Sequence, residues 1–158
     1  MLAITQTVTV NAAFLQEIKE DDRVLRQLLQ RAADLFLSAP PVHPRPEQTA
    51  RLLGQLRDQL ATHFALEESF GYFEQAVDVA PHLSERADVL RSEHQSLSRA
   101  ICDLTDEAEQ LCFTKPAGNV HGPLGLRYRT FHQQFEVHEA GENELIQQAY
   151  NDDLGVGD

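Results

Sequence analysis

The sequence predicts an all-α protein, an up-down-up-down antiparallel four-helix bundle. Apolar residues recur at spacings of three and four in four long segments, and this spacing places them on one face of an α-helix. The segments between them are short and rich in Pro and Gly, which end helices and form turns. Short connections make successive helices antiparallel. Because 158 residues are the length of one domain, we expect a single domain over residues 1–158.

Each predicted helix is bounded by residues that cap or break helices. Asn11 is of a type that caps helix N-termini, and several prolines follow Ala39. Pro81 and Pro116 mark the next two breaks, and Gly122-Pro123 is predicted to lie in the loop before the last helix. The predicted helices cover about 11–39, 47–75, 82–113 and 124–150, with short tails at both ends.

Composition argues against several classes of function. The formal net charge is -12, and the arginines are scattered among acidic residues, so we expect no nucleic-acid partner. The N-terminus lacks the pattern of a signal peptide, and no apolar run has transmembrane length, so we expect a cytoplasmic protein without a membrane partner. Cys102 and Cys112 are ten residues apart in one predicted helix, too far along its axis to bridge, and are expected to be reduced thiols.

Histidine followed by glutamate four residues later is the main chemical motif. On a helix these side chains lie on one face, so an imidazole and a carboxylate can meet one metal cluster. Apolar flanks select the pairs His63–Glu67 and His138–Glu142, because a ligand inside a bundle must occupy a core position. The other two pairs, His43–Glu47 and His132–Glu136, lie among prolines or charged residues and are predicted to be in a loop or at the surface.

The other two predicted helices add polar residues at the same level. His94 shares a core stripe with Leu90 and Leu97 on the third. On the first, the stripe of Phe14, Ile18, Leu25 and Leu29 has one polar gap, at Asp22, with Asp21 as the alternative. All these positions lie near mid-bundle, and a bundle interior tolerates such a layer only if its members satisfy one another or a cation.

Three segments carry a resemblance to a known family. They resemble the metal motifs of hemerythrin-like (HHE cation-binding) domains, in the right order and over nearly the whole chain: Ala61-Thr62-His63-Phe64-Ala65-Leu66-Glu67-Glu68, Ser92-Glu93-His94-Gln95-Ser96-Leu97 and Phe135-Glu136-Val137-His138-Glu139-Ala140-Gly141-Glu142-Asn143-Glu144-Leu145. The resemblance implies a non-haem di-iron centre with an oxygen bridge. His63, His94 and His138 would ligate iron, and Glu67 and Glu142 would be carboxylate ligands that bridge the two ions.

Two departures from the family pattern bear on function. Asp22 or Asp21 stands where the family usually has a first-helix histidine, and the second histidine that oxygen-carrying hemerythrins place on the third helix is missing. Such a ligand set favours ferric iron. We therefore expect oxygen or redox sensing, or iron handling, rather than reversible oxygen carriage, with O₂, another diatomic molecule or peroxide as the small ligand. The protein partner of such a sensor is not specified by the sequence.

Several alternatives accompany this interpretation. Zn or Mn also suits these ligands. The same centre would also suit a di-iron oxidase, a peroxidase-like enzyme or an iron-repair enzyme, although a binding protein is favoured, and a metal-free interaction bundle is the third possibility. Glu68, Glu93 and Glu139 are expected to face solvent, the alternative being hydrogen bonds to metal-bound imidazoles. Tyr128 is expected to be a core residue, with a hydrogen bond near the cluster as the alternative.

Overall fold

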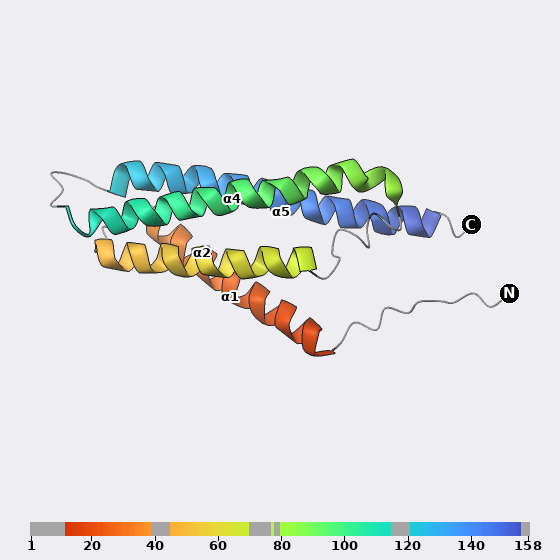
Figure 1. Ribbon diagram of the computed structural model, residues 1–158, viewed down its shortest axis with the longest axis horizontal. Helices are drawn as coiled ribbons and strands as arrows, with labels where there is room; N and C mark the ends of the chain where they lie inside the picture. Colours follow the sequence, from red (N-terminus) through yellow and green to blue (C-terminus); the bar gives the residue numbers. More distant parts are fainter. Residues whose placement is uncertain (1–11, 39–44, 70–76, 78–79, 115–120, 156–158) are drawn as a thin grey trace.

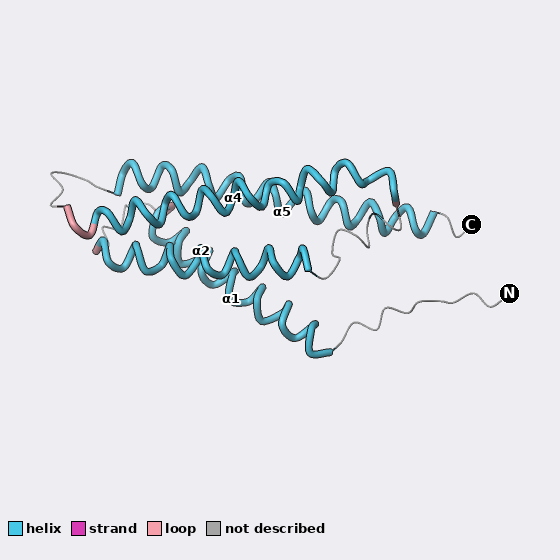
Figure 2. The backbone as a smooth tube through the Cα atoms, in the orientation of Figure 1, coloured by secondary structure: helices cyan, strands magenta, loops and turns pink. Residues whose placement is uncertain are grey.

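The computed structural model consists of four long helices and one short 3₁₀ helix in the residues it describes, which are 12–38, 45–69, 77, 80–114 and 121–155 (Figures 1 and 2). Successive long helices run in opposite directions and neighbour one another in the cyclic order α1, α2, α4, α5, which confirms the predicted bundle. The α1–α5 pair makes the sparsest contact, and α1 is inclined to the others (Figure 1). The elements are α1 (Ala12–Phe36), α2 (Pro46–Ser69), η1 (Pro81–Leu83), α4 (Ser84–Leu111) and α5 (His121–Gly155).

The predicted helix boundaries differ from the structure at several ends, and both ends of α5 need correction. Gly122-Pro123 was expected in a loop, but both residues lie in the first turn of α5. Proline is tolerated there because the first N–H groups of a helix have no intrahelical partner. The helix also continues to Gly155 instead of ending at residue 150. Asn11, His43 and residues 70–75 lie outside the described residues.

The apolar core is divided into two clusters. The larger contains Leu97 and Ile101 of α4 together with Phe131 and Phe135 of α5, and the smaller contains Ala87, Leu90, Leu145 and Ala149. Between the two clusters, the buried polar residues are His94 on α4 and His138 and Glu142 on α5. The predicted core stripes of these two helices are therefore confirmed, with a polar layer interrupting each of them.

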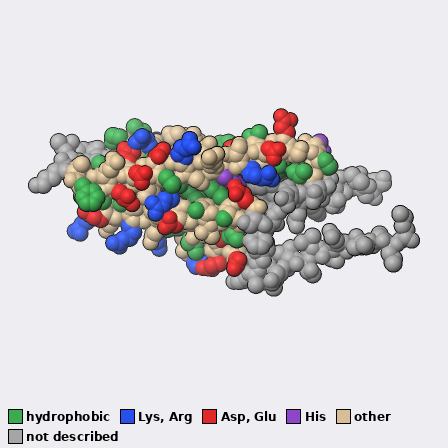
Figure 3. Space-filling view, viewed as in Figure 1, with side chains coloured by type: hydrophobic (Ala, Val, Ile, Leu, Met, Phe, Trp, Pro, Cys, Tyr) green, Lys and Arg blue, Asp and Glu red, His purple; other side chains and the backbone are tan. Residues whose placement is uncertain are grey.

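The bundle surface is strongly charged. On the face shown in Figure 3, Lys and Arg side chains lie among Asp and Glu side chains instead of forming one patch. Within the described ranges, none of the helices is long and apolar enough to cross a membrane. Cys102 and Cys112 are both free, as expected.

Gly141 lies where α5 packs closely against α4. A Cβ atom there would lie 2.9 Å from Leu90 Cδ2 and 2.7 Å from the Arg86 guanidinium. Arg86 is exposed and can move, whereas Leu90 is fully buried. A Cβ atom at Gly54 would make only ordinary contacts, at 3.8 Å or more. Gly141 thus sets the separation of the two helices beside Glu142.

This difference predicts opposite effects of two Gly→Ala substitutions. Gly54→Ala is expected to raise the free energy of unfolding by about 0.5–1 kcal/mol, because Ala favours the helix. Gly141→Ala should lower it by about 0.5–2 kcal/mol, because overpacking against Leu90 outweighs that gain. Chemical denaturation of the metal-free variants measures both. Equal stabilisation by the two substitutions would contradict the packing argument.

Candidate metal centre

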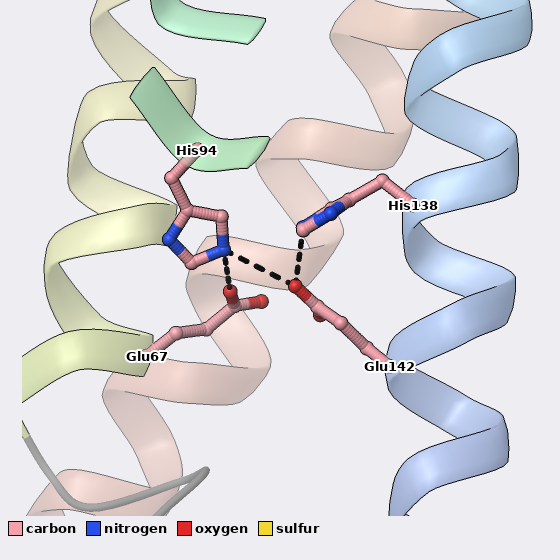
Figure 4. A group of neighbouring side chains, drawn as sticks. All are labelled: Glu67, His94, His138 and Glu142. Atoms are coloured by element: carbon pink, nitrogen blue, oxygen red, sulfur yellow. Dashed lines mark hydrogen bonds and ion pairs between the residues drawn. The ribbon is translucent and has the colours of Figure 1, made fainter. Parts of the chain in front are cut away.

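Four side chains converge between the two apolar clusters. Glu67 of α2, His94 of α4, and His138 and Glu142 of α5 point toward one another (Figure 4). One ligand atom from each lies within 4.8 Å of every other, and all four residues are buried. The helical spacing creates this arrangement: His138 and Glu142 are one turn apart on α5, and the antiparallel neighbours bring Glu67 and His94 to the same level.

Of the other two predicted metal ligands, His63 and Asp22, only His63 lies at this site. His63 joins from α2: its Nε2 atom lies 2.7 Å from Glu67 Oε1. Asp22 was expected on the core-facing stripe of α1, and this is wrong: its side chain is 57% exposed and pairs with Arg26. Asp21, the alternative, is only 7% exposed. We call the six residues that converge here the polar layer: Asp21, His63, Glu67, His94, His138 and Glu142.

The error on α1 has a simple geometric cause. The predicted stripe included Ile18, which is 37% exposed, and continued through Asp22. The described residues of α1 that are buried are Asp21, Leu25, Leu28, Leu29 and Ala32, so Leu25 and Leu29 were predicted correctly and the stripe is rotated by one position only near its start. Because α1 is inclined to the other helices, periodicity alone did not select between adjacent aspartates.

Each imidazole of the polar layer has a carboxylate on its outer nitrogen. The Nδ1 atom lies 2.8 Å from Asp21 in His63, 3.0 Å from Glu68 in His94 and 2.9 Å from Glu93 in His138. An ionised carboxylate only accepts hydrogen bonds, so Nδ1–H is the donor in each pair. The Nε2 atoms of all three rings then face inward, toward Glu67 or Glu142.

Glu68 and Glu93 therefore correct a second expectation. Both were predicted to face solvent, and their side chains are indeed 48% and 36% exposed, but each carboxylate accepts a hydrogen bond from a buried imidazole. Glu139 instead binds Arg26 of α1 through two hydrogen bonds. Gln59, which the sequence did not single out, donates to Asp21 at 2.6 Å. Each of these contacts joins two helices, and no spacing within one helix reveals it.

The electrostatics of the layer favour positive charge at its centre. Burial alone would lower the pKa of His63 and of His94. The carboxylates around the rings outweigh burial and raise the pKa to about 9 for His63 and about 10 for His94. The pKa of His138 is also raised, chiefly by Glu142 against the effect of burial. Burial would raise the pKa of Glu67, but His63 and His94 lower it to about 2. Without a metal, protons on the imidazoles supply the positive charge.

Hydrogen bonding within the layer is nevertheless incomplete. In the described part of the chain, Glu67 Oε2 and His138 Nε2 are buried and make no hydrogen bond of ordinary geometry, and their contacts are the ion pairs with His94 and Glu142. Buried polar atoms are costly when unsatisfied. A carboxylate oxygen and an imidazole nitrogen directed at the same space are also the donor atoms that bind divalent transition metals. The residues present therefore fit a bound cation.

Tyr128 lies apart from this site. Its ring is fully buried and stacks on Phe36 of α1 at a centroid distance of 4.7 Å, within the larger apolar cluster. Burial raises the pKa of its hydroxyl, and among described residues that hydroxyl has no hydrogen-bond partner. Tyr128 is thus a core residue, as expected.

The fold and the site together define a four-helix bundle with a buried layer of imidazoles and carboxylates able to hold a cation. The hemerythrin HHE cation binding domain matches residues 13–150, almost the whole length of the chain. The protein belongs to this family. No curated protein and no solved structure matched the chain.

Substitutions of Asp21 and Asp22 test whether the carboxylate that accepts a hydrogen bond from His63 Nδ1 contributes to metal binding. We expect Asp21→Asn to weaken metal binding by about 10–100-fold, because loss of a carboxylate that orients a ligand imidazole typically has this effect. Asp22→Asn removes the same charge one residue away, from an exposed side chain, and should leave the affinity unchanged. Metal titration of both metal-free variants measures the difference. Equal affinities would show that Asp21 does not orient His63.

Proposed function

We propose that this protein holds two iron ions in the polar layer and senses or handles oxygen, redox state or iron. The observation that carries the proposal is the inward direction of three imidazole Nε2 atoms around two buried carboxylates, with a carboxylate outside each ring. Carboxylates outside metal-bound histidines fix the Nδ1–H form and leave Nε2 free to ligate. His63, His94, His138, Glu67 and Glu142 would hold the metal.

The proposal of two ions is supported by Glu67, whose two carboxylate oxygens contact different histidines. Its Oε1 atom faces His63 at 2.7 Å and its Oε2 atom faces His94 at 3.0 Å. A carboxylate with one oxygen directed to each side suits a bridge between two cations. Family membership supports a cation, and the choice of iron over Zn or Mn rests on the resemblance to hemerythrins. Asp21 is assigned to orient His63 and not to ligate.

Bound iron would supply one-electron chemistry toward O₂ or another small ligand. The protein's own residues would set its environment. The two apolar clusters exclude water on either side of the polar layer, and the carboxylates of Glu67 and Glu142 offset cationic charge. Anionic oxygen ligands stabilise ferric iron, so we propose sensing or iron handling instead of reversible oxygen carriage. This function requires no dedicated organic substrate.

Elemental analysis and an absorption spectrum of freshly purified protein test the proposal. We expect about two iron ions per chain and near-ultraviolet charge-transfer bands after exposure to air. Protein that contains no metal and binds none on reconstitution would instead favour a metal-free interaction bundle. An O₂ titration of the reduced protein that gave a stable and fully reversible spectral change would contradict the assignment against oxygen carriage, and catalytic turnover of peroxide would favour an enzyme.

A further inference from the structure

The polar layer is not symmetric about Glu67. On one side lie His94, His138 and Glu142, and together with Glu67 they form the group whose ligand atoms are all within 4.8 Å of one another. The His94 and His138 side chains are 4% and 1% exposed. A cation on this side would meet four protein ligands in a site closed to solvent. We call this the closed position.

The other side of Glu67 has fewer ligands. His63 Nε2 contacts Glu67 Oε1 at 2.7 Å, but His63 is not a member of the close group of four. Asp21 is held away from metal binding, because its two oxygens receive hydrogen bonds from His63 Nδ1 and Gln59. The described residues therefore supply one imidazole and one shared carboxylate here. We call this the open position.

The open position is also nearer to solvent. The His63 side chain is 15% exposed, more than either of the other two imidazoles. A groove of about 400 Å³ runs between α1 and α2, and its lining includes Gln59 and Thr62, which flank Asp21 and His63. His63 itself does not line this groove, so the greater exposure of its side chain is the observation that places the open position nearer to solvent.

We infer that the two metal positions have unequal affinities, and that the open position, at His63, is the one that exchanges its cation. The inference rests on the proposed function and adds the order in which the two positions bind their metal ions. The closed position fills first and keeps its ion, because four buried ligands surround it. The open position fills second, with the remaining ligands drawn from solvent. An exchangeable ion suits a protein that takes up or releases iron.

Anaerobic titration of the metal-free protein with Fe²⁺, followed by elemental analysis after dialysis, tests the inference. We expect one ion bound tightly and a second bound at least about 100-fold more weakly, since loss of even one outer partner typically weakens binding by 10–100-fold. His63→Ala should abolish the weak step and leave the tight one. His138→Ala should abolish the tight step. His132→Ala, which removes an imidazole paired with Glu136 on the same helix as His138, should change neither.

The results separate this inference from the proposed function. Two ions bound with equal affinity, or loss of both ions together in His63→Ala, would overturn the inference and leave the di-iron proposal intact. No binding to the unmodified protein would overturn both. If His138→Ala fails to fold, as judged by its far-ultraviolet circular dichroism, Glu142→Gln replaces it, because Glu142 belongs to the same closed position. Retention of the tight step in Glu142→Gln would also contradict the assignment.

Discussion

Glu67→Gln is expected to release both metal ions. Glu67 is buried on α2 and contacts His63 through one oxygen and His94 through the other, so the two proposed metal positions would share its charge. Glutamine preserves the shape of the side chain but offers one neutral oxygen. We expect each affinity to fall by at least about 100-fold, beyond the 10–100-fold typical of an outer partner. Fe²⁺ titration with elemental analysis measures the loss.

Thermodynamic linkage gives a second measure of this variant. A metal present at about 100 times its dissociation constant stabilises a folded protein by about 2.7 kcal/mol. Added metal should therefore raise the midpoint of unfolding of the unmodified protein and leave that of Glu67→Gln almost unchanged. Glu136→Gln is the matched control, because Glu136 has the same spacing from His132 but a side chain that is 64% exposed. Affinities in Glu67→Gln equal to those of the unmodified protein at either position would disprove the shared role of Glu67.

Phe64→Ala is expected to lower the free energy of unfolding by about 3–5 kcal/mol, the usual effect of truncating a buried aromatic side chain. Phe64 is 4% exposed, and its ring stacks on His94 at a centroid distance of 4.2 Å and meets the edge of His138 at 6.0 Å. Its removal leaves a cavity between the larger apolar cluster and the polar layer. Denaturant unfolding of the metal-free protein measures the change.

An exposed aromatic residue serves as the control for Phe64. Phe113 is 91% exposed, and Phe113→Ala should change the free energy of unfolding by no more than about 0.5 kcal/mol. Phe64→Leu keeps an apolar side chain of similar bulk and should lose much less stability than Phe64→Ala. If Phe64→Ala lost less than about 1 kcal/mol, Phe64 would not be a packing element of the site.

The local pattern of each helix accounts for the parts that were predicted correctly. On α4 and α5, apolar residues at helical spacing flank His94, His138 and Glu142, and all three are buried. The pair His63–Glu67 is one turn apart on α2, so their contact follows from helix geometry alone. The boundary of α5 was placed wrongly because proline both breaks helices and fits their first turn.

Contacts between helices account for the parts that were missed. Glu68 and Glu93 point about 100° away from their sequence neighbours Glu67 and His94, yet each reaches an imidazole on a neighbouring helix. Arg26 binds Glu139, 113 residues further along the chain, and this interaction has no sequence signature. Such contacts depend on the rotation and inclination of each helix, which periodicity specifies only to within about one residue.

The sequence by itself determined the four-helix bundle and the level at which its polar residues meet, because apolar periodicity and proline-rich breaks are local properties of the chain. Only the tertiary structure decided between Asp21 and Asp22, supplied a carboxylate for each imidazole and placed His63 outside the close group of four ligand-type side chains. The physical reason is that the inclination and rotation of each helix arise from packing among all four helices. On α1, a rotation by one residue would bury Asp22 instead of Asp21.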